Sequence, residues 1–274
     1  MSSGSFSAAL RYELSLRNRE YATRRGISLS ESYGDPPVIC YQPDGLNHGN
    51  FLPETYRAIL RKPQWTTRLA KVHAQARSTL PRADRRWCEL DSGNSSDALL
   101  MNVFCFPPTL KRPEIAQLLG IDTGLMPDFG VKAKVPFSNG RFDRTEVDMR
   151  LGDLLVEAKL TESDFQAAEP ALVESYRDLH GVFDIRQLPQ RDGRYCSYQL
   201  IRNVLAAHAS GCSICVMADA RRPDLREAWY EVMRCVLPIE LRWRCKMLTW
   251  QEVAAVAPQK LQRFLAEKYG IHAA

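Results

Sequence analysis

Residues 145–165, TEVDMRLGDLLVEAKLTESDF, contain two short runs in which apolar and polar residues alternate on either side of Gly152-Asp153. A period of two indicates β-strands, because successive side chains of a strand point to opposite faces of the sheet. Gly-Asp favours a two-residue hairpin loop, since glycine readily adopts the positive φ of the first loop position. The sequence therefore predicts strands over 145–151 and 154–160, joined by a tight turn.

A two-residue loop also fixes the register of the two strands, and Asp148 then falls opposite Glu157 and Glu146 opposite Lys159. Opposed residues place their Cβ atoms about 4.5–5.5 Å apart, so two carboxylates would repel unless a cation lay between them. Hard oxygen ligands of this kind suit Mg²⁺ or Mn²⁺. The alternative interpretation is an exposed strand face of ion pairs, with Glu146 beside Lys159 and Asp148 beside Arg150.

The chemistry of these side chains matches phosphodiester hydrolysis. A bound divalent cation would polarise the scissile phosphate and lower the pKa of an attacking water. Lys159 lies two residues beyond Glu157 on the same strand face, where its ammonium could orient that water or stabilise developing charge. Asp148, Glu157 and Lys159 are therefore the predicted catalytic residues.

The rest of the chain mixes helical and strand patterns, which predicts an α/β (α+β) fold with a mixed central sheet flanked by helices. We expect a helical, basic N-terminal extension over 1–90 and a core over 91–274 with an insertion at 162–196. Residues 31–50 are rich in turn formers. The expected helices cover 6–25, 53–80 with a break near Lys62-Pro63, 97–104, 112–119, 169–180, 197–209, 224–235, 250–256 and 258–268. The remaining strands are expected at 130–136, 213–218 and 241–248.

Positive charge is concentrated in part of this chain of 274 residues and net charge +5. Residues 51–90 hold nine Arg or Lys and three acids. A basic patch near aromatic residues favours nucleic-acid binding, although an ordinary solvated helical face is the alternative. Phosphate contacts are expected from Arg57, Arg61, Arg68, Lys71, Arg77, Arg85 and Arg86, and from the outward row of strand 241–248, Arg242, Arg244 and Lys246.

Other classes of protein are disfavoured. The sequence has no apolar run of the ~20 residues that span a bilayer, and its start lacks the features of a signal peptide. Six of the eight cysteines have no partner at zinc-site spacing. The other two, Cys212 and Cys215, form a CxxC that lies in an apolar run typical of a buried strand. We therefore expect a cytoplasmic protein with reduced thiols and no membrane partner.

Asp148, followed by Glu157-Ala158-Lys159 on the next strand, resembles the PD-(D/E)XK nuclease superfamily, which has the restriction-endonuclease-like fold. The order helix, three strands, helix, strand over 95–218 is similar to the core of that superfamily. The resemblance implies Asp148 and Glu157 as metal ligands, with the backbone carbonyl of Ala158 as a third, and Lys159 as the catalytic lysine.

The resemblance also implies roles for residues outside the hairpin. Asp97, on the first core helix, is the candidate for a further, weaker metal ligand. The helix over 197–209 is expected to place Gln199, Arg202 and Asn203 beside the site, where they could contact nucleic acid.

The predicted function is that of a metal-dependent endonuclease, using Mg²⁺ or Mn²⁺, that acts on DNA in a restriction-type, defence or mobile-element role. A nuclease acting on RNA or on branched repair intermediates is one alternative. The other is a nucleic-acid-binding or assembly protein that keeps the scaffold without catalysis. A homodimer or a complex with a partner protein is compatible with either.

Overall fold

The computed structural model describes residues 3–32, 34, 36–72 and 81–273. The chain forms two compact units. The sheet unit consists of residues 129–248 together with 1–6, and the helical unit consists of residues 7–128 and 249–274. These borders differ from the expected regions 1–90 and 91–274.

None of the described helices combines the length and the apolar character that crossing a lipid bilayer demands.

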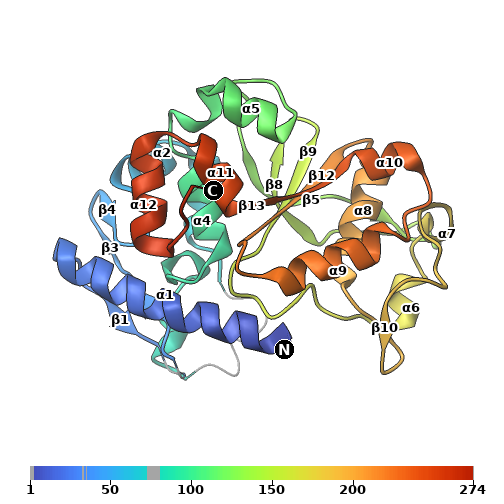
Figure 1. Cartoon of the computed structure of the whole chain (residues 1–274), viewed down its shortest axis with the longest axis horizontal. Helices are drawn as coiled ribbons and strands as arrows, with labels where there is room; N and C mark the ends of the chain where they lie inside the picture. Colours follow the sequence, from blue (N-terminus) through green and yellow to red (C-terminus); the bar gives the residue numbers. More distant parts are fainter. Residues whose placement is uncertain (1–2, 33, 35, 73–80, 274) are drawn as a thin grey trace. The chain divides into compact units, whose positions relative to one another are not determined.

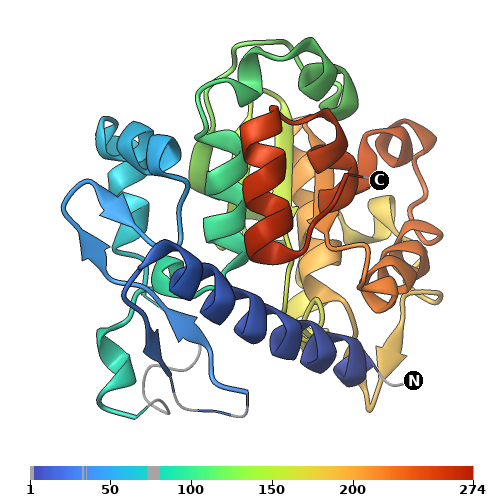
Figure 2. The ribbon, with the colours of Figure 1, turned by 60° about the vertical axis from the view of Figure 1, so that its left-hand side comes forward.

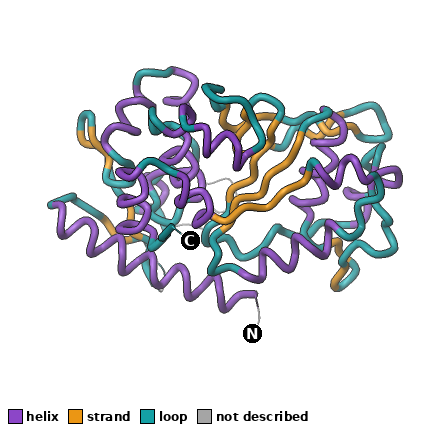
Figure 3. Tube along the Cα trace, turned by 45° about the horizontal axis from the view of Figure 1, so that its top comes forward, coloured by secondary structure: helices purple, strands orange, loops and turns teal. Residues whose placement is uncertain are grey.

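The sheet unit is built on five strands in a mixed sheet, which confirms the predicted fold class (Figures 1 and 3). Strand β9 is antiparallel to β8 and parallel to β12. The spatial order is β13 (Cys245–Thr249), β12 (Ser213–Ala218), β9 (Leu154–Ala158), β8 (Glu146–Leu151) and β5 (Asp128–Lys132).

The β8–β9 hairpin has the register that the sequence predicts. Gly152 adopts φ of 54°, in the left-handed region that favours glycine. The ladder pairs Met149 with Val156, Arg150 with Leu155 and Leu151 with Leu154. Because side chains alternate along each strand, this register sets which residues of the hairpin share a face.

Helix α8 (Tyr198–Ser210) packs against one face of this sheet. Its apolar positions Ile201, Val204 and Leu205 belong to one buried core with Leu155 of β9 and Ile214 of β12. Fully burying a side chain of this size contributes about 1.5–3 kcal/mol. This packing holds α8 over the part of β9 that carries the charged residues. Helix α9 (Pro223–Met233) contributes to the same core.

The single helix that was predicted over 169–180 in the insertion is wrong. The structure has two short helices, α6 (Pro170–Val173) and α7 (Leu179–Val182). Between them the backbone pairs with a neighbouring segment, since Ser138 N–H donates to the Ser175 carbonyl and Arg177 N–H donates to the Pro136 carbonyl. The same unit contains two small hairpins, formed by β6 (Val135–Pro136) with β7 (Phe142–Asp143) and by β10 (Gln190–Arg191) with β11 (Arg194–Tyr195).

The expected strand over 241–248 is wrong in its first half. Helix α10 (Ile239–Trp243) follows Pro238, and β13 begins only at Cys245. Arg242 therefore lies on a helix, and Arg244 Nη1 donates to the Cys212 carbonyl at 3.0 Å. The predicted outward row of three basic residues on one strand does not exist.

The helical unit contains most of the remaining helices, and Figure 2 shows α1 as one continuous helix. Ser95 caps α4 (Ser96–Phe104) by accepting a hydrogen bond from the Ala98 N–H. The predicted break of the helical segment near Lys62-Pro63 is confirmed. Residues 73–80, which include the predicted phosphate contact Arg77, lie outside the described residues. The helices are α1 (Ser3–Arg25), of which residues 7–25 belong to this unit, α2 (Pro53–Leu60), α3 (Pro63–Leu69), α4 (Ser96–Phe104), α5 (Pro113–Leu119), α11 (Trp250–Val256) and α12 (Gln259–Tyr269). Residues 31–50 form short ladders, β1 (Ser30–Glu31) with β2 (Ile39–Cys40) and β3 (Pro43–Asp44) with β4 (Asn47–His48).

A buried lysine lies in the core of the helical unit. Lys268 Nζ donates to Asn18 Oδ1 at 2.5 Å and lies 4.1 Å from the centroid of the Tyr41 ring. Burial lowers the pKa of Lys268 well below its ordinary value of 10.5. The unfolded chain therefore binds more protons than the folded chain between that lowered pKa and 10.5.

We expect the free energy of unfolding of the wild type to rise with pH in this window, relative to Lys268→Met. The variant has no amine to titrate, and methionine fills a similar volume without a charge. Urea unfolding of both proteins at about pH 7 and about pH 10 measures the difference. Equal pH dependence of the two proteins would show that Lys268 keeps an ordinary pKa when folded.

Candidate active site

Glu157 and Lys159 form a buried ion pair at the end of β9. Their exposed fractions are 3% and 4%, and Lys159 Nζ donates to Glu157 Oε1 at 2.8 Å. The alternative interpretation of an exposed face of ion pairs is therefore wrong for these two residues. The side chain of Lys159 is enclosed by protein, so its removal would leave a cavity.

Two residues of α8 complete the surroundings of Glu157. Asn203 Nδ2 donates to Glu157 Oε2 at 2.9 Å, so both oxygens of this carboxylate accept hydrogen bonds. Arg202 Nη2 in turn donates to Asn203 Oδ1 at 2.9 Å and to the Glu146 carbonyl at 3.1 Å. Arg202 and Asn203, predicted as contacts to nucleic acid, are buried in the structure and position Glu157.

The electrostatics keep this pair ionised. Burial by itself would raise the pKa of Glu157, but the charges of Lys159 and Arg202 and the hydrogen bonds hold it below its usual value. Burial would lower the pKa of Lys159, but the carboxylates of Glu157, Glu162 and Asp148 raise it well above its usual value. A fixed positive charge thus faces three carboxylates at neutral pH.

Asp148 lies on β8, and its carboxylate contacts the backbone of β9. Its Oδ2 accepts a hydrogen bond from the Ala158 N–H at 2.8 Å. The carboxylate therefore lies at the backbone between Glu157 and Lys159, and its charge acts on Lys159. The structure brings the three predicted catalytic residues together, as the hairpin register indicated.

A family model described as a restriction endonuclease associating with ARP matches residues 16–270. The chain belongs to this family. The match includes residues of both compact units, so residues 16–90 are part of the family's sequence and not a separate addition. Searches of curated proteins and of solved structures returned no match. Family membership makes the protein a restriction-endonuclease-like protein and supports nuclease activity.

In this restriction-endonuclease-like protein the site offers donors that suit a hard divalent cation. Asp148, Glu157 and the Ala158 carbonyl are the oxygen donors. Gln199, which was predicted beside the site, lies on α8 one helical turn before Asn203, and its buried Oε1 makes no hydrogen bond to any described residue. An unpaired buried oxygen commonly has a bound water or ion as its partner. Among the described residues, no three His, Cys, Asp or Glu side chains form a complete metal site. The donors fit Mg²⁺ in type, and a bound Mg²⁺ would keep several waters.

Arg222 is a residue of the site that sequence reasoning missed. It lies between β12 and α9, is almost fully buried, and holds the segment that follows Lys159. Its guanidinium donates to three backbone carbonyls, those of Leu160 at 3.2 Å, Glu162 at 2.7 Å and Ser163 at 3.1 Å. It also pairs with Asp224 at 2.7 Å. The signal in the sequence is an arginine pair, Arg221-Arg222, that follows a buried strand after two intervening residues.

Tyrosines tether the insertion of this restriction-endonuclease-like protein to α8. Tyr176 Oη donates to Asp143 Oδ2 at 2.5 Å and lies 2.8 Å from Tyr198 Oη. Burial would raise the pKa of Asp143, but hydrogen bonds from Thr145 and Tyr176 hold it below its usual value. Tyr198, which shares a helix face with Arg202, is thus engaged inside the protein.

The remaining predicted residues lie in the helical unit. Asp97 Oδ2 accepts hydrogen bonds from Arg68 at 2.8 Å and from Lys71 at 2.6 Å, and Lys71 also pairs with Glu89 at 3.0 Å. The predicted weak metal ligand is thus held by two of the predicted phosphate contacts. The predicted contacts that are exposed are Arg57, Arg61, Arg85 and Arg86, the last stacked on Trp87.

Proposed function

We propose that the chain is a cytoplasmic endonuclease of the PD-(D/E)XK superfamily that hydrolyses DNA with Mg²⁺ or Mn²⁺. The observation that carries the proposal is the buried Lys159–Glu157 pair, with Asp148 bonded to the backbone between them, in a member of a restriction-endonuclease family. The family description also supports the proposal that the protein acts together with an ARP partner.

Each residue of the site has a separate task in this proposal. Asp148, Glu157 and the Ala158 carbonyl would hold the cation, which when bound polarises a phosphate oxygen and acidifies a water. Lys159 carries a fixed positive charge where negative charge develops, or orients the attacking water. Asn203 and Arg202 keep the Glu157 carboxylate in one orientation.

A single-turnover cleavage assay on plasmid DNA, with Mg²⁺, with Mn²⁺ and with chelator, tests this function. Asp148→Asn and Glu157→Gln should lose activity through weaker cation binding, and high Mn²⁺ should restore part of the activity of Asp148→Asn. Asp153→Asn is the matched control, because this exposed carboxylate lies in the loop of the same hairpin. Cleavage that persists in chelator, or at the wild-type rate in Asp148→Asn, would refute the proposal.

The same assay separates the alternatives. Preferential cleavage of RNA or of branched junctions would replace plasmid DNA as the substrate while keeping the site. Binding without cleavage of any of these substrates would instead indicate an assembly protein.

The exposed arginines of the helical unit should add to DNA affinity without contributing sequence specificity. We expect the triple variant Arg57→Gln/Arg61→Gln/Arg85→Gln to bind DNA more weakly and with a flatter salt dependence. Each lost phosphate contact should reduce the slope of log K against log salt by about 0.9. Fluorescence anisotropy over a salt series measures the slope, with exposed Arg186→Gln as the control. An unchanged slope would exclude these arginines from the interface.

A further inference from the structure

Four large apolar side chains are exposed at the end of α9 and along α10, within the sheet unit. The exposed fractions are 64% for Tyr230, 54% for Leu237, 52% for Ile239 and 77% for Trp243. Ile239 and Trp243 are four residues apart on a helix and so share a face. Isolated exposed apolar residues are ordinary, but a group of them indicates an interaction surface. We call residues 226–243 the α9–α10 face.

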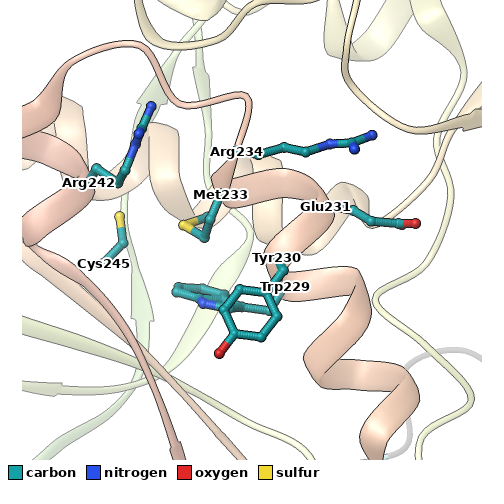
Figure 4. Close-up of a pocket in the computed structure, with 7 residues that line it drawn as sticks. All are labelled: Trp229, Tyr230, Glu231, Met233, Arg234, Arg242 and Cys245. Atoms are coloured by element: carbon teal, nitrogen blue, oxygen red, sulfur yellow. The ribbon is translucent and has the colours of Figure 1, made fainter.

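A groove of about 560 Å³ lies in this face (Figure 4). In the view of Figure 4 the rings of Trp229 and Tyr230 overlap below Met233, and the side chains of Arg242 and Arg234 lie to the left and to the right. The groove is lined by Trp229, Tyr230, Glu231, Met233, Arg234, Arg242 and Cys245. The groove is open to solvent rather than enclosed, so a side chain of another molecule can reach it.

The charges of the α9–α10 face decide what kind of partner it suits. Its exposed charged residues are balanced in sign, in contrast to the net charge of +5 of the whole chain: Arg226, Arg234 and Arg242 against Glu227, Glu231 and Glu240. Nucleic acid is recognised by surfaces of net positive charge, so the balance disfavours it. A second copy of the same face brings an arginine for every glutamate and a glutamate for every arginine.

The exposed apolar side chains supply a large part of the area that such an interface buries. Burying the exposed parts of Trp243 and Tyr230 would remove roughly 300 Å² from water in each copy. Leu237, Ile239 and the arginine stems add to this area, and a stable interface buries about 800 Å² of each partner. Trp, Tyr and Arg are also the residue types that dominate binding energy in protein interfaces.

We propose that the α9–α10 face is the interface of a homodimer, formed by two copies related by a two-fold axis. In a two-fold interface the same patch is used by both copies, so it must be complementary to itself. Trp243 of each copy fills the groove of the other, and the exposed arginines and glutamates pair across the interface. This proposal does not depend on the proposed nuclease function.

Sedimentation velocity of the purified full chain over a concentration series tests the dimer. The wild type should sediment as a dimer, and Trp243→Ser and Ile239→Ser should each weaken association at least about tenfold, the equivalent of about 1.4 kcal/mol. The control is Leu46→Ser, which removes an exposed apolar side chain of the helical unit and should leave the dimer intact. Thermal melts verify that each variant is folded.

A charge-reversal experiment distinguishes a two-fold interface from association through another surface. Arg226→Glu/Arg234→Glu makes the face acidic, and Glu227→Arg/Glu231→Arg makes it basic. Each variant alone should be monomeric because like charges meet, and an equal mixture should form a heterodimer, identified by native mass spectrometry. A wild type that is monomeric up to about 100 μM, a dimer that persists in the Trp243 and Ile239 variants, or two reversed variants that do not associate would overturn the proposal.

Discussion

Lys159→Met is expected to cleave DNA about 10²–10³-fold more slowly than the wild type, because a single well-placed donor contributes that much to the rate. The same change should lower the free energy of unfolding by about 3–5 kcal/mol, the cost of leaving one partner of a buried ion pair alone. Glu157 would keep only the hydrogen bond from Asn203. Single-turnover cleavage and urea unfolding measure the two effects.

A double variant separates catalysis from stability. Lys159→Met/Glu157→Gln removes both charges and should regain most of the lost stability, while cleavage should stay at the level of the single variant or below. If Lys159→Met has both the stability and the cleavage rate of the wild type, the buried pair is not the active site.

The pH dependence of the pair follows from the same pKa shifts. Glu157 has a pKa lower in the folded state than its usual 4.5, so its contribution to stability is present above 4.5 and is lost as the pH falls through the lowered value. The free energy of unfolding of the wild type should therefore fall relative to that of the double variant on acidification below pH 4.5, which urea unfolding of both proteins measures.

Arg222→Met should also destabilise the protein by about 3–5 kcal/mol, because it leaves a buried carboxylate and three carbonyls without their donor. We expect the segment after Lys159 to open locally, since Arg222 holds it through the carbonyls of Leu160, Glu162 and Ser163. Cleavage should fall with it, because the backbone that positions Lys159 is no longer fixed.

Urea unfolding and limited proteolysis between residues 160 and 165 measure this effect. Arg222→Lys keeps the charge but not the fork of donors, and should recover only part of the stability. Exposed Arg186→Met serves as the control. Wild-type stability and protease resistance in Arg222→Met would show that these hydrogen bonds contribute nothing.

Local patterns predicted the parts of the fold that depend on neighbouring residues. The β8–β9 hairpin followed from alternation and from one glycine, and α8 followed from its apolar stripe. The alternation over 241–248 was misleading. A strand would turn Leu241 and Trp243 to the same face, whereas helix α10 buries Leu241 and leaves Trp243 exposed. A period of two over so few residues does not exclude a helix.

The residues of the candidate site that lie on the hairpin could be predicted from the sequence, whereas the residues that surround them could not. The family resemblance predicted that Arg202 and Asn203 lie beside the site, but sequence does not tell whether they point to solvent or to a buried carboxylate. Asp97 was assigned by analogy, whereas its pairing with Arg68 and Lys71 depends on tertiary contacts. The hydrogen bonds of Arg222 join residues about 60 positions apart, which no local pattern encodes.

The bond from the Ala158 N–H to Asp148 has a consequence for how the hairpin forms. Shifting β9 by one residue against β8 would turn Glu157 and Lys159 to the other face of the sheet, where Met149 and Val156 are packed. Charges buried there without Asn203 and Asp148 would cost several kcal/mol. The residues assigned to catalysis therefore also favour one pairing register of β8 and β9. A chain that pairs these strands incorrectly forms neither a stable sheet nor the site.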